Sequence, residues 1–240
     1  MMKLDTETTT QRSMLWLTVA ALTGFAILAG LGTWQINRLA WKQSVIANIQ
    51  TRIAMPAVPL PVGDALDPDA WQYRRVAVRG RFLHEHEMHV LAHTQRGNVG
   101  YDLITPLQRE DGGYVLVNRG WVPQAKKQQS SRPQSLDPGV VVIEGIAQKG
   151  WAQAFFVPDN NPVQNLWFFG DIPAMAANAG ISAPRIFVEA APYPDPTKLP
   201  LGGQTRLDIP NNHLQYAITW YSLAAILAVF YILIYRRRAG

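Results

Sequence analysis

Two long stretches without a formal charge lie at opposite ends of the chain. Residues 13–37 contain no Asp, Glu, Lys or Arg, and residues 209–235 form a second such stretch. About 20 helical residues cross the roughly 30 Å hydrocarbon core of a bilayer, so each stretch is long enough to span a membrane. Trp and Tyr side chains near the ends of both stretches are typical of spanning helices. We therefore predict transmembrane helices over 13–37 and 209–235.

Two other structures produce similar apolar stretches. A buried helix of a soluble core seldom needs more than about 14 uncharged residues, which makes it the weaker alternative. A cleaved signal peptide has an apolar segment of about 7–15 residues that ends at small residues. The first stretch is longer, follows the acidic residues Asp5 and Glu7, and has no such end. We expect an uncleaved anchor.

The charges beside the two stretches orient the chain. Three arginines, residues 236–238, directly follow the second stretch, and basic residues beside a span stay in the cytoplasm. We predict cytoplasmic tails at 1–12 and 236–240 and a periplasmic, extracytoplasmic domain over 38–208. The N-terminal tail contains acidic residues and is not rich in arginine, unlike a transit peptide, which favours the inner (plasma) membrane of a bacterium.

Between the stretches the pattern changes from helical to strand-like. Residues 37–53 continue the first helix as an amphipathic one, and a segment with three prolines follows. Short runs rich in β-branched residues then alternate with turn residues. These runs lie at 75–80, 88–91, 103–104, 115–117, 140–143 and 186–188. The predicted fold class is a membrane protein whose two transmembrane α-helices flank a β-rich (α+β) domain, built as an antiparallel sheet or small barrel.

Local signals in this domain predict three further features. The sequence Asp-Gly-Gly at 111–113 lies between two apolar runs and predicts a hairpin turn, because glycine readily adopts positive φ. A helix is expected from Asp171 to about Gly180, with Pro173 in its first turn. Gly120 is expected to be a turn glycine at the end of a strand.

Composition limits the chemistry of the chain. The 240 residues are 48% hydrophobic and 16% charged, and none is cysteine, which excludes thiol chemistry and iron–sulfur clusters. The net charge of +5 is spread out, so we expect no nucleic acid as a partner. The phosphate-binding, nucleophile-elbow and dinucleotide-binding motifs are absent. The residues alone therefore give no support for an enzyme but do not exclude one, and the expectation of a non-enzymatic role comes from the family resemblance described below.

Four histidines crowd into the segment HEHEMHVLAH, at His84, His86, His89 and His93. The zinc-protease motif H-E-x-x-H is not met. On a strand, His84 and His86 would share one face and could ligate copper or zinc. The alternative is a solvated polar edge. It is the favoured interpretation, because the spacing of histidines without known geometry is weak evidence for a metal site.

His213 lies at the outer end of the second stretch. Ionisable residues at membrane spans are often functional, and neutral imidazole is a good ligand for haem iron. At helical spacing Tyr216, Ala217 and Trp220 follow it on one face, and an apolar slot between two helices can hold a porphyrin. The alternative is an interfacial histidine bonded to water or a lipid headgroup, and the residues alone favour this alternative.

Five blocks of sequence are specific enough to compare with known families. They read G-x-W-Q-x-x-R (32–38), R-x-x-x-x-G-x-F (75–82), G-Y followed by T-P-L (100–107), V-L-V-N-R-G-W-V-P (115–123) and N-N-H-L-x-Y-A-x-T-W (211–220). In these blocks, and in their order, the chain resembles the surfeit locus protein one (Shy-type) family of cytochrome c oxidase assembly factors.

The resemblance implies a chaperone-like role in building the haem-bearing subunit of a haem–copper oxidase. Bacterial members are similar to haem a binding proteins, and the histidine of the last block, His213 here, is the family's candidate iron ligand. Haem a is thus the implied cofactor, held between the spans, with Tyr216 and Trp220 as candidate contacts. Arg38 could pair with a haem propionate or extend toward the headgroups from the helix end.

The implied partners are cytochrome c oxidase subunit I, haem a synthase and membrane lipid. Two alternatives stay open. The chain could be a haem-independent scaffold that holds immature oxidase subunits, or an extracytoplasmic enzyme or metal-delivery protein that uses the histidine cluster.

Overall fold

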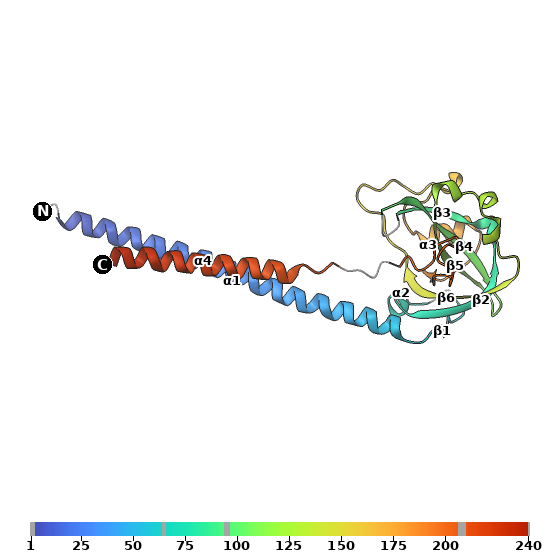
Figure 1. Cartoon of the computed structure of the whole chain (residues 1–240), viewed down its shortest axis with the longest axis horizontal. Coiled ribbons are helices and arrows are strands. Elements are labelled where there is room, and N and C mark those ends of the chain that lie inside the picture. The colour runs from blue at the N-terminus through green and yellow to red at the C-terminus, as the bar shows by residue number, and fades with distance from the viewer. Residues whose placement is uncertain (1–2, 64–65, 94–96, 206–209, 240) are drawn as a thin grey trace. The chain divides into compact units, whose positions relative to one another are not determined.

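Two long helices and a β-sheet domain make up the chain. The computed structural model describes residues 3–63, 66–93, 97–205 and 210–239 (Figure 1). The chain divides into a helical unit, Met1–Asn48 with Asp208–Gly240, and a second unit, Ile49–Leu207. We call the second unit the head.

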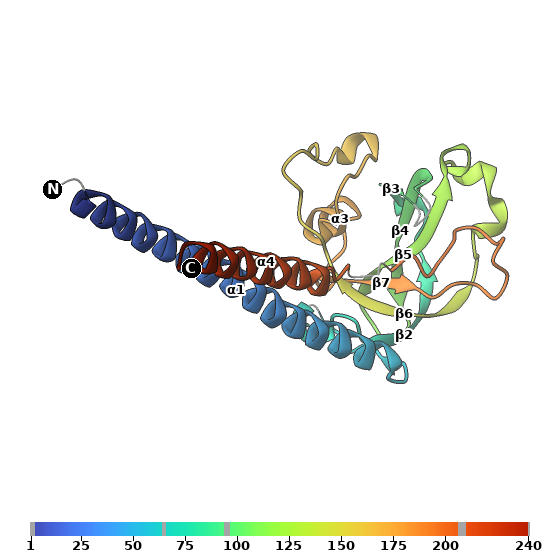
Figure 2. The same ribbon diagram turned by 60° about the vertical axis from the view of Figure 1, so that its left-hand side comes forward.

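The helical unit is an antiparallel pair. Helix α1 (Lys3–Ala54) has 52 residues and helix α4 (His213–Ala239) has 27, and the two lie side by side (Figures 1 and 2). The hydroxyl of Thr18 lies 2.9 Å from that of Tyr231, and the hydroxyl of Thr33 lies 3.0 Å from that of Tyr221. Residue numbers therefore rise along one helix as they fall along the other, so the two chain termini lie at the same end of the pair.

Small residues let the two helices approach closely. A Cβ on Gly32 would lie 2.9 Å from the Tyr221 ring, and one on Gly24 would lie 3.1 Å from Leu227 Cδ2. Ala217 and Ala224 of α4 are buried. Close approach of this kind is how helices associate where no hydrophobic effect drives them together.

The first predicted span is helical throughout and the second from His213 onward, residues 210–212 lying before the helix, and both helices extend past the spans at their charged ends. Helix α1 runs through the expected tail 1–12 from Lys3 onward, and α4 runs into the expected tail 236–240. Charge limits a membrane span but does not end a helix, and Lys, Glu and Arg are good helix formers. The expected start at 209 lies outside the described residues. Met14–Ala54 and His213–Arg237 are long and apolar enough to cross a membrane, by length and composition.

The head contains a seven-stranded sheet in the order β1-β2-β6-β7-β5-β4-β3. The strands are β1 (Val58–Pro59), β2 (Arg75–Phe82), β3 (Met88–His93), β4 (Val99–Arg109), β5 (Tyr114–Pro123), β6 (Val140–Lys149) and β7 (Ile186–Ala190). All six predicted strand-like runs lie in strands. The two-residue strand β1 was not predicted, because its proline-rich sequence resembles a connector.

The sheet is mixed rather than antiparallel. Strand β7 pairs in parallel with β5, and β1 pairs in parallel with β2, while the other ladders are antiparallel. A further antiparallel pairing joins β2 to β4 through Gly80 and Arg109. This pairing closes strands β2, β6, β7, β5 and β4 into a small barrel. The parallel strands β5 and β7 are separated in the sequence by β6 and long connections, as parallel neighbours require, because a tight turn joins only antiparallel strands.

Two apolar clusters hold the head together. One fills the barrel and consists of Leu60, Val76, Val78, Phe82, Leu107, Val115, Val117, Ala147, Ile186 and Val188. The second lies under α3 (Ile172–Asn178) and includes Leu116 and Phe187. Successive residues of a strand point to opposite faces, so β5 and β7 supply both clusters.

The predicted helix and hairpin are confirmed. Helix α3 is capped by the Asp171 carboxylate, which accepts from Ala174 N at 3.1 Å. Gly112 and Gly113 have positive φ in the β4–β5 hairpin. Further short helices are α2 (Pro68–Trp71) and the 3-10 helices η1 (His84–His86), η2 (Gln124–Lys126), η3 (Gln129–Ser131), η4 (Pro133–Ser135) and η5 (Pro162–Gln164).

The expectation for Gly120 was wrong. This glycine lies inside β5 with φ +117°, and a Cβ on it would lie 2.2 Å from the Leu201 carbonyl oxygen. The Leu201 backbone pairs there with Trp121. Only glycine permits both this φ and this close approach.

Candidate functional site

His213 is the first residue of α4, preceded by the helix-breaking Pro210. The helix starts with the Tyr216 amide donating to the Asn212 carbonyl at 3.3 Å. The His213 side chain is half-buried. A histidine at this place keeps part of its ring accessible while the helix start fixes its backbone.

Gln35 of α1 holds the imidazole of His213. Nδ1 of His213 lies 2.7 Å from Oε1 of Gln35, and Gln35 is only 9% exposed. An amide oxygen can only accept a hydrogen bond, so Nδ1 is the donor in this contact, and in the neutral tautomer with Nδ1–H the lone pair is on Nε2. No residue of the described chain hydrogen-bonds Nε2. This arrangement is the one by which an outer partner orients a metal-ligating histidine.

His213, Tyr216, Ala217 and Trp220 lie in α4 at the spacing of one helix face, but they differ in burial. Ala217 is buried and Trp220 is half-buried. Tyr216 is 55% exposed. At about 100° per residue, Tyr216 lies about 60° from His213 on one side and Ala217 about 40° on the other, so Ala217 packs into the helix pair while Tyr216 stays exposed on the same broad face.

Arg38 does not join His213. Among the described residues, its guanidinium contacts the Trp41 ring, 4.0 Å from the ring centroid, one turn along α1. The Arg38 side chain is exposed. This local cation–π pair fits a helix-surface arginine. The nearby Lys42 donates instead to the Pro210 carbonyl and ties α1 to the start of α4.

His213 offers a nitrogen that suits haem iron, but the helix pair does not form a slot that could enclose a haem beside it. The close packing of Gly32 on Tyr221 and the burial of Ala217 leave no room for a porphyrin between the helices near His213. An apolar groove of about 230 Å³ lies further along the pair, lined by Ala21, Leu22, Phe25, Leu227, Ala228, Tyr231 and Ile232. Ligand pockets usually measure about 300–1,000 Å³. A haem on His213 would therefore contact the outer surface of the pair.

The histidine cluster is dispersed rather than gathered. His84 and His86 lie in the 3-10 turn η1, so the expected shared strand face was wrong. His84 Nε2 lies 3.0 Å from the Asp137 carbonyl oxygen. The side chain of His93 lies outside the described residues, and the rest of the described chain contains no group of three His, Cys, Asp or Glu suited to a metal.

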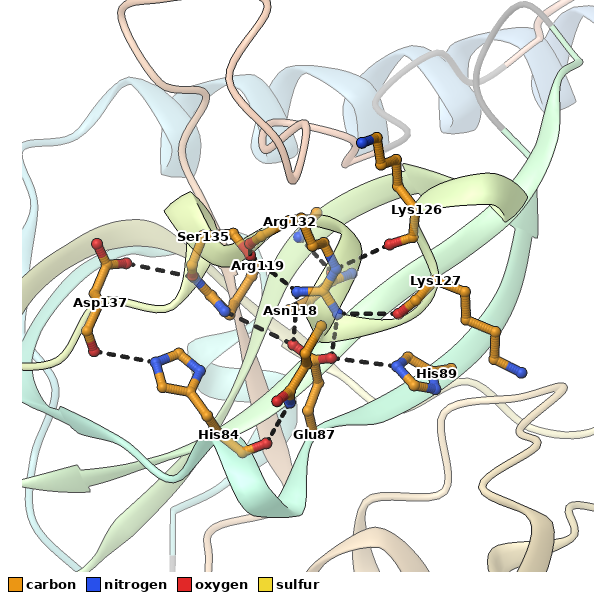
Figure 3. A network of polar contacts seen from close by, with 12 residues as sticks. His84, Glu87, His89, Asn118, Arg119, Lys126, Lys127, Arg132, Ser135 and Asp137 are labelled. Carbon is orange, nitrogen blue, oxygen red and sulfur yellow. Dashed lines mark hydrogen bonds and ion pairs between the residues drawn. The ribbon is translucent and has the colours of Figure 1, made fainter.

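Two of the four histidines, His84 and His89, lie in or beside a buried network of charged residues (Figure 3). Glu87 is 5% exposed and accepts hydrogen bonds from both Nη atoms of Arg132 and, at 3.2 Å, from Nε2 of His89. Burial alone would raise the pKa of Glu87, but the hydrogen bonds from His89 and Arg132 and the charge of Arg132 together lower it. Glu87 is therefore a buried anion.

Arg119, from the V-L-V-N-R-G-W-V-P block, extends this network. Its Nη1 lies 3.8 Å from Glu87 Oε2, its Nη2 lies 3.4 Å from Asp137 Oδ2, and the guanidinium lies 4.5 Å from the Phe82 ring centroid. It also donates to the Ser135 carbonyl. The network joins η1, β5 and the segment 124–137. It was not predicted, since no spacing in the sequence relates Glu87 to Arg132.

These features define a class of protein. Two long apolar helices pack antiparallel, a mixed-sheet barrel lies between them in the sequence, and a histidine whose Nδ1 is hydrogen-bonded to Gln35 begins the second helix. The model of the SURF1 family matches residues 22–225.

Relatives agree with that match. The "SURF1-like protein" of Monosiga brevicollis is 40% identical over 223 residues, covering 88% of this chain and 84% of its own. "Surfeit locus protein 1" of Rattus norvegicus is 37% identical over 211 residues, covering 82% and 68%. The Homo sapiens protein of that name is 37% identical over 212 residues, covering 82% and 70%. The chain belongs to the SURF1 family.

Proposed function

We propose that the chain is a membrane-bound, non-enzymatic assembly factor for cytochrome c oxidase. In this role it binds haem a through His213 and aids its insertion into oxidase subunit I. Family membership and the sequence blocks support the oxidase as partner. The contact between His213 Nδ1 and Gln35 Oε1 is the observation that supports the haem ligand.

Each part of the site has a role in this proposal. Gln35 accepts the hydrogen bond from Nδ1 of His213 and so orients the ring with Nε2 pointing away from Gln35. Lys42 and the small residues of the helix pair fix the start of α4. A bound haem would supply an iron that accepts a nitrogen ligand, and Nε2 of His213 would provide it. Trp220 and Tyr216 are the nearest aromatic groups along α4, and their rings offer flat apolar surface to a macrocycle.

The two apolar helices place the site at a membrane in this proposal. An antiparallel pair brings both termini to one face, and the arginines at 236–238 favour the cytoplasmic face. The head then lies on the outer side, and the bacterial inner membrane is the setting that the N-terminal tail favours. Haem a synthase is a further partner in such a pathway, as the source of the haem.

The second candidate is a haem-independent scaffold that holds immature oxidase subunits. The closed seam between α1 and α4 favours it, because the helices offer no enclosed haem slot. Both candidates require the same fold, so a test must change the ligand nitrogen and nothing else.

Complementation separates the two candidates. Cells that make haem a and lack this protein would receive the wild-type chain, His213→Ala, or the control His86→Ala, which alters a turn residue of the head. We expect His213→Ala to reduce the haem a content of purified subunit I at least tenfold relative to the control. Full haem content with His213→Ala would overturn haem binding by His213 and leave the scaffold.

A further inference from the structure

Two adjacent phenylalanine rings of the head are almost fully exposed and pack on each other. Phe155 and Phe156 are each 92% exposed, and Val163 in the same loop is 97% exposed. The two rings meet edge to face with their centroids 4.8 Å apart. Soluble surfaces rarely expose adjacent large apolar groups, and where they do the surface usually binds something. We call residues 151–167 the phenylalanine loop.

Hydrogen bonds within the tip of this loop define its conformation. The Val157 amide donates to the Ala154 carbonyl at 3.0 Å, which closes a turn with the two phenylalanines at its centre. Gln153 Nε2 donates to the Val157 carbonyl at 2.7 Å and to Asp159 Oδ1 at 3.0 Å. These bonds stabilise a conformation in which both rings point out of the head.

The base of the loop is fixed to the core. The Trp151 ring lies 5.6 Å from that of Phe187, centroid to centroid, and a Cβ on Gly170 would lie 2.5 Å from the Trp151 ring. The exposed tip therefore follows a residue whose ring packs against the buried Phe187 and against Gly170, although Trp151 itself stays partly exposed.

The loop begins where the chain enters and leaves the head. A cavity of about 740 Å³ is lined by Trp151 together with Gln72 and Thr205. The carbonyl of Gln72 accepts from Arg52 Nη1, near the end of α1, at 3.0 Å. Thr205 is the last described residue before the connection to α4. Residues next to both chain connections of the head therefore lie at the cavity that the base of the loop also lines.

The charge of the loop indicates what it contacts. Residues 151–167 contain no Lys or Arg and one acidic residue, Asp159. Anionic headgroups or an acidic protein surface would be met by basic residues, whereas uncharged aromatic rings partition into the interfacial region of a bilayer.

We propose that Phe155 and Phe156 insert into the interface of the membrane that α1 and α4 span, as a third attachment of the head. The inference rests on the proposed membrane topology. Because no basic residue takes part, insertion is independent of salt and of anionic lipid. The attachment restricts the rotation of the head about its two chain connections.

The chain lacks cysteine, so single cysteines can carry a spin label in the full-length protein. Labels at Phe155→Cys and, as a water-exposed control, at Gln128→Cys would be measured in phosphatidylcholine nanodiscs. The readout is the ratio of relaxation by oxygen, which concentrates in lipid, to relaxation by a water-soluble nickel chelate. A third label at Phe25→Cys, on the exposed surface of α1, tests the membrane topology itself.

We expect the ratio at Phe155→Cys to be at least threefold above that at Gln128→Cys, and unchanged when phosphatidylglycerol is added. A ratio equal to that at Gln128→Cys, with a high ratio at Phe25→Cys, would overturn the inference and leave the topology intact. A low ratio at Phe25→Cys would overturn both. Protection of Phe155→Cys from both reagents would also overturn it, in favour of a protein partner.

Discussion

Nδ1 of His213 and Oε1 of Gln35 lie 2.7 Å apart and join the first turn of α4 to α1. Both residues belong to the sequence blocks that the chain shares with its family, at 32–38 and 211–220. The bond couples two properties that are otherwise separate. The packing of the helices sets the position of Gln35, and Gln35 sets which nitrogen of His213 is free.

The tautomer of His213 can be read before any haem is bound. In protein labelled with ¹⁵N-histidine, we expect the His213 ring to carry its hydrogen on Nδ1, because only that nitrogen faces an acceptor. The signal is assigned by its loss in His213→Ala. In Gln35→Leu the bias should disappear, since either nitrogen can then be protonated. A ring protonated on Nε2 in the wild type would contradict the assignment.

The helix seam offers a matched pair of substitutions. Gly32→Leu should force α1 and α4 apart, because even a Cβ at that position lies 2.9 Å from the Tyr221 ring, whereas a Cβ on Gly30 has nothing within 4 Å. We expect Gly32→Leu, and not Gly30→Leu, to lower the thermal stability of the helical unit and to abolish the Nδ1–H signal of His213. Equal effects of the two variants would show that the seam does not control the histidine.

Glu87 should be among the least replaceable residues of the head. Glu87→Gln leaves the buried Arg119 and Arg132 without their shared anion, and breaking a buried ion pair costs about 3–5 kcal/mol. The control is Glu110→Gln, which removes the exposed pair with Arg79 and should cost at most about 1 kcal/mol. Denaturant unfolding of both variants gives the difference, and a similar small cost for both would contradict the structural role of the network.

The buried carboxyl of Glu189 has a raised pKa, in contrast to the lowered pKa of Glu87, and should make the stability of the head depend on pH. Burial raises its pKa, the charge of Asp102 adds to this, and the hydrogen bond from Thr205 only partly offsets it. A carboxyl with a raised pKa in the folded state destabilises the fold as the pH rises from the ordinary glutamate range through the raised value. We expect Glu189→Gln to raise the melting temperature at pH 8 and to match the wild type at pH 4. An unchanged melting temperature at pH 8 would contradict the burial of an anion there.

Much of the fold follows from hydrophobic periodicity. The alternation in β2, where Val76 and Val78 are buried between more exposed neighbours, is visible in the sequence. The capped start of α3 and the Gly112–Gly113 turn are local signals of the same kind. The barrel closure is not visible, because the pairing of Gly80 with Arg109 joins segments whose register no local pattern records.

Individual residues of the site could be predicted from the sequence, but the contacts between them could not. His213 was found from its position at the end of an apolar stretch. The contact with Gln35 spans 178 residues of sequence, and only the packing of α1 on α4 creates it. Helical spacing alone does not say which stripe of α4 faces α1, so the burial of Ala217 and the exposure of Tyr216 could not be predicted. The histidine cluster misled because a 3-10 turn, not a strand, carries His84 and His86.

The central claim is that His213 ligates haem a, and titration of the purified full-length chain with haem a tests it most directly. The account predicts a shifted Soret band that saturates with the wild-type chain and with His86→Ala, and that is lost in His213→Ala. A Soret band of the same position and amplitude in His213→Ala would contradict it.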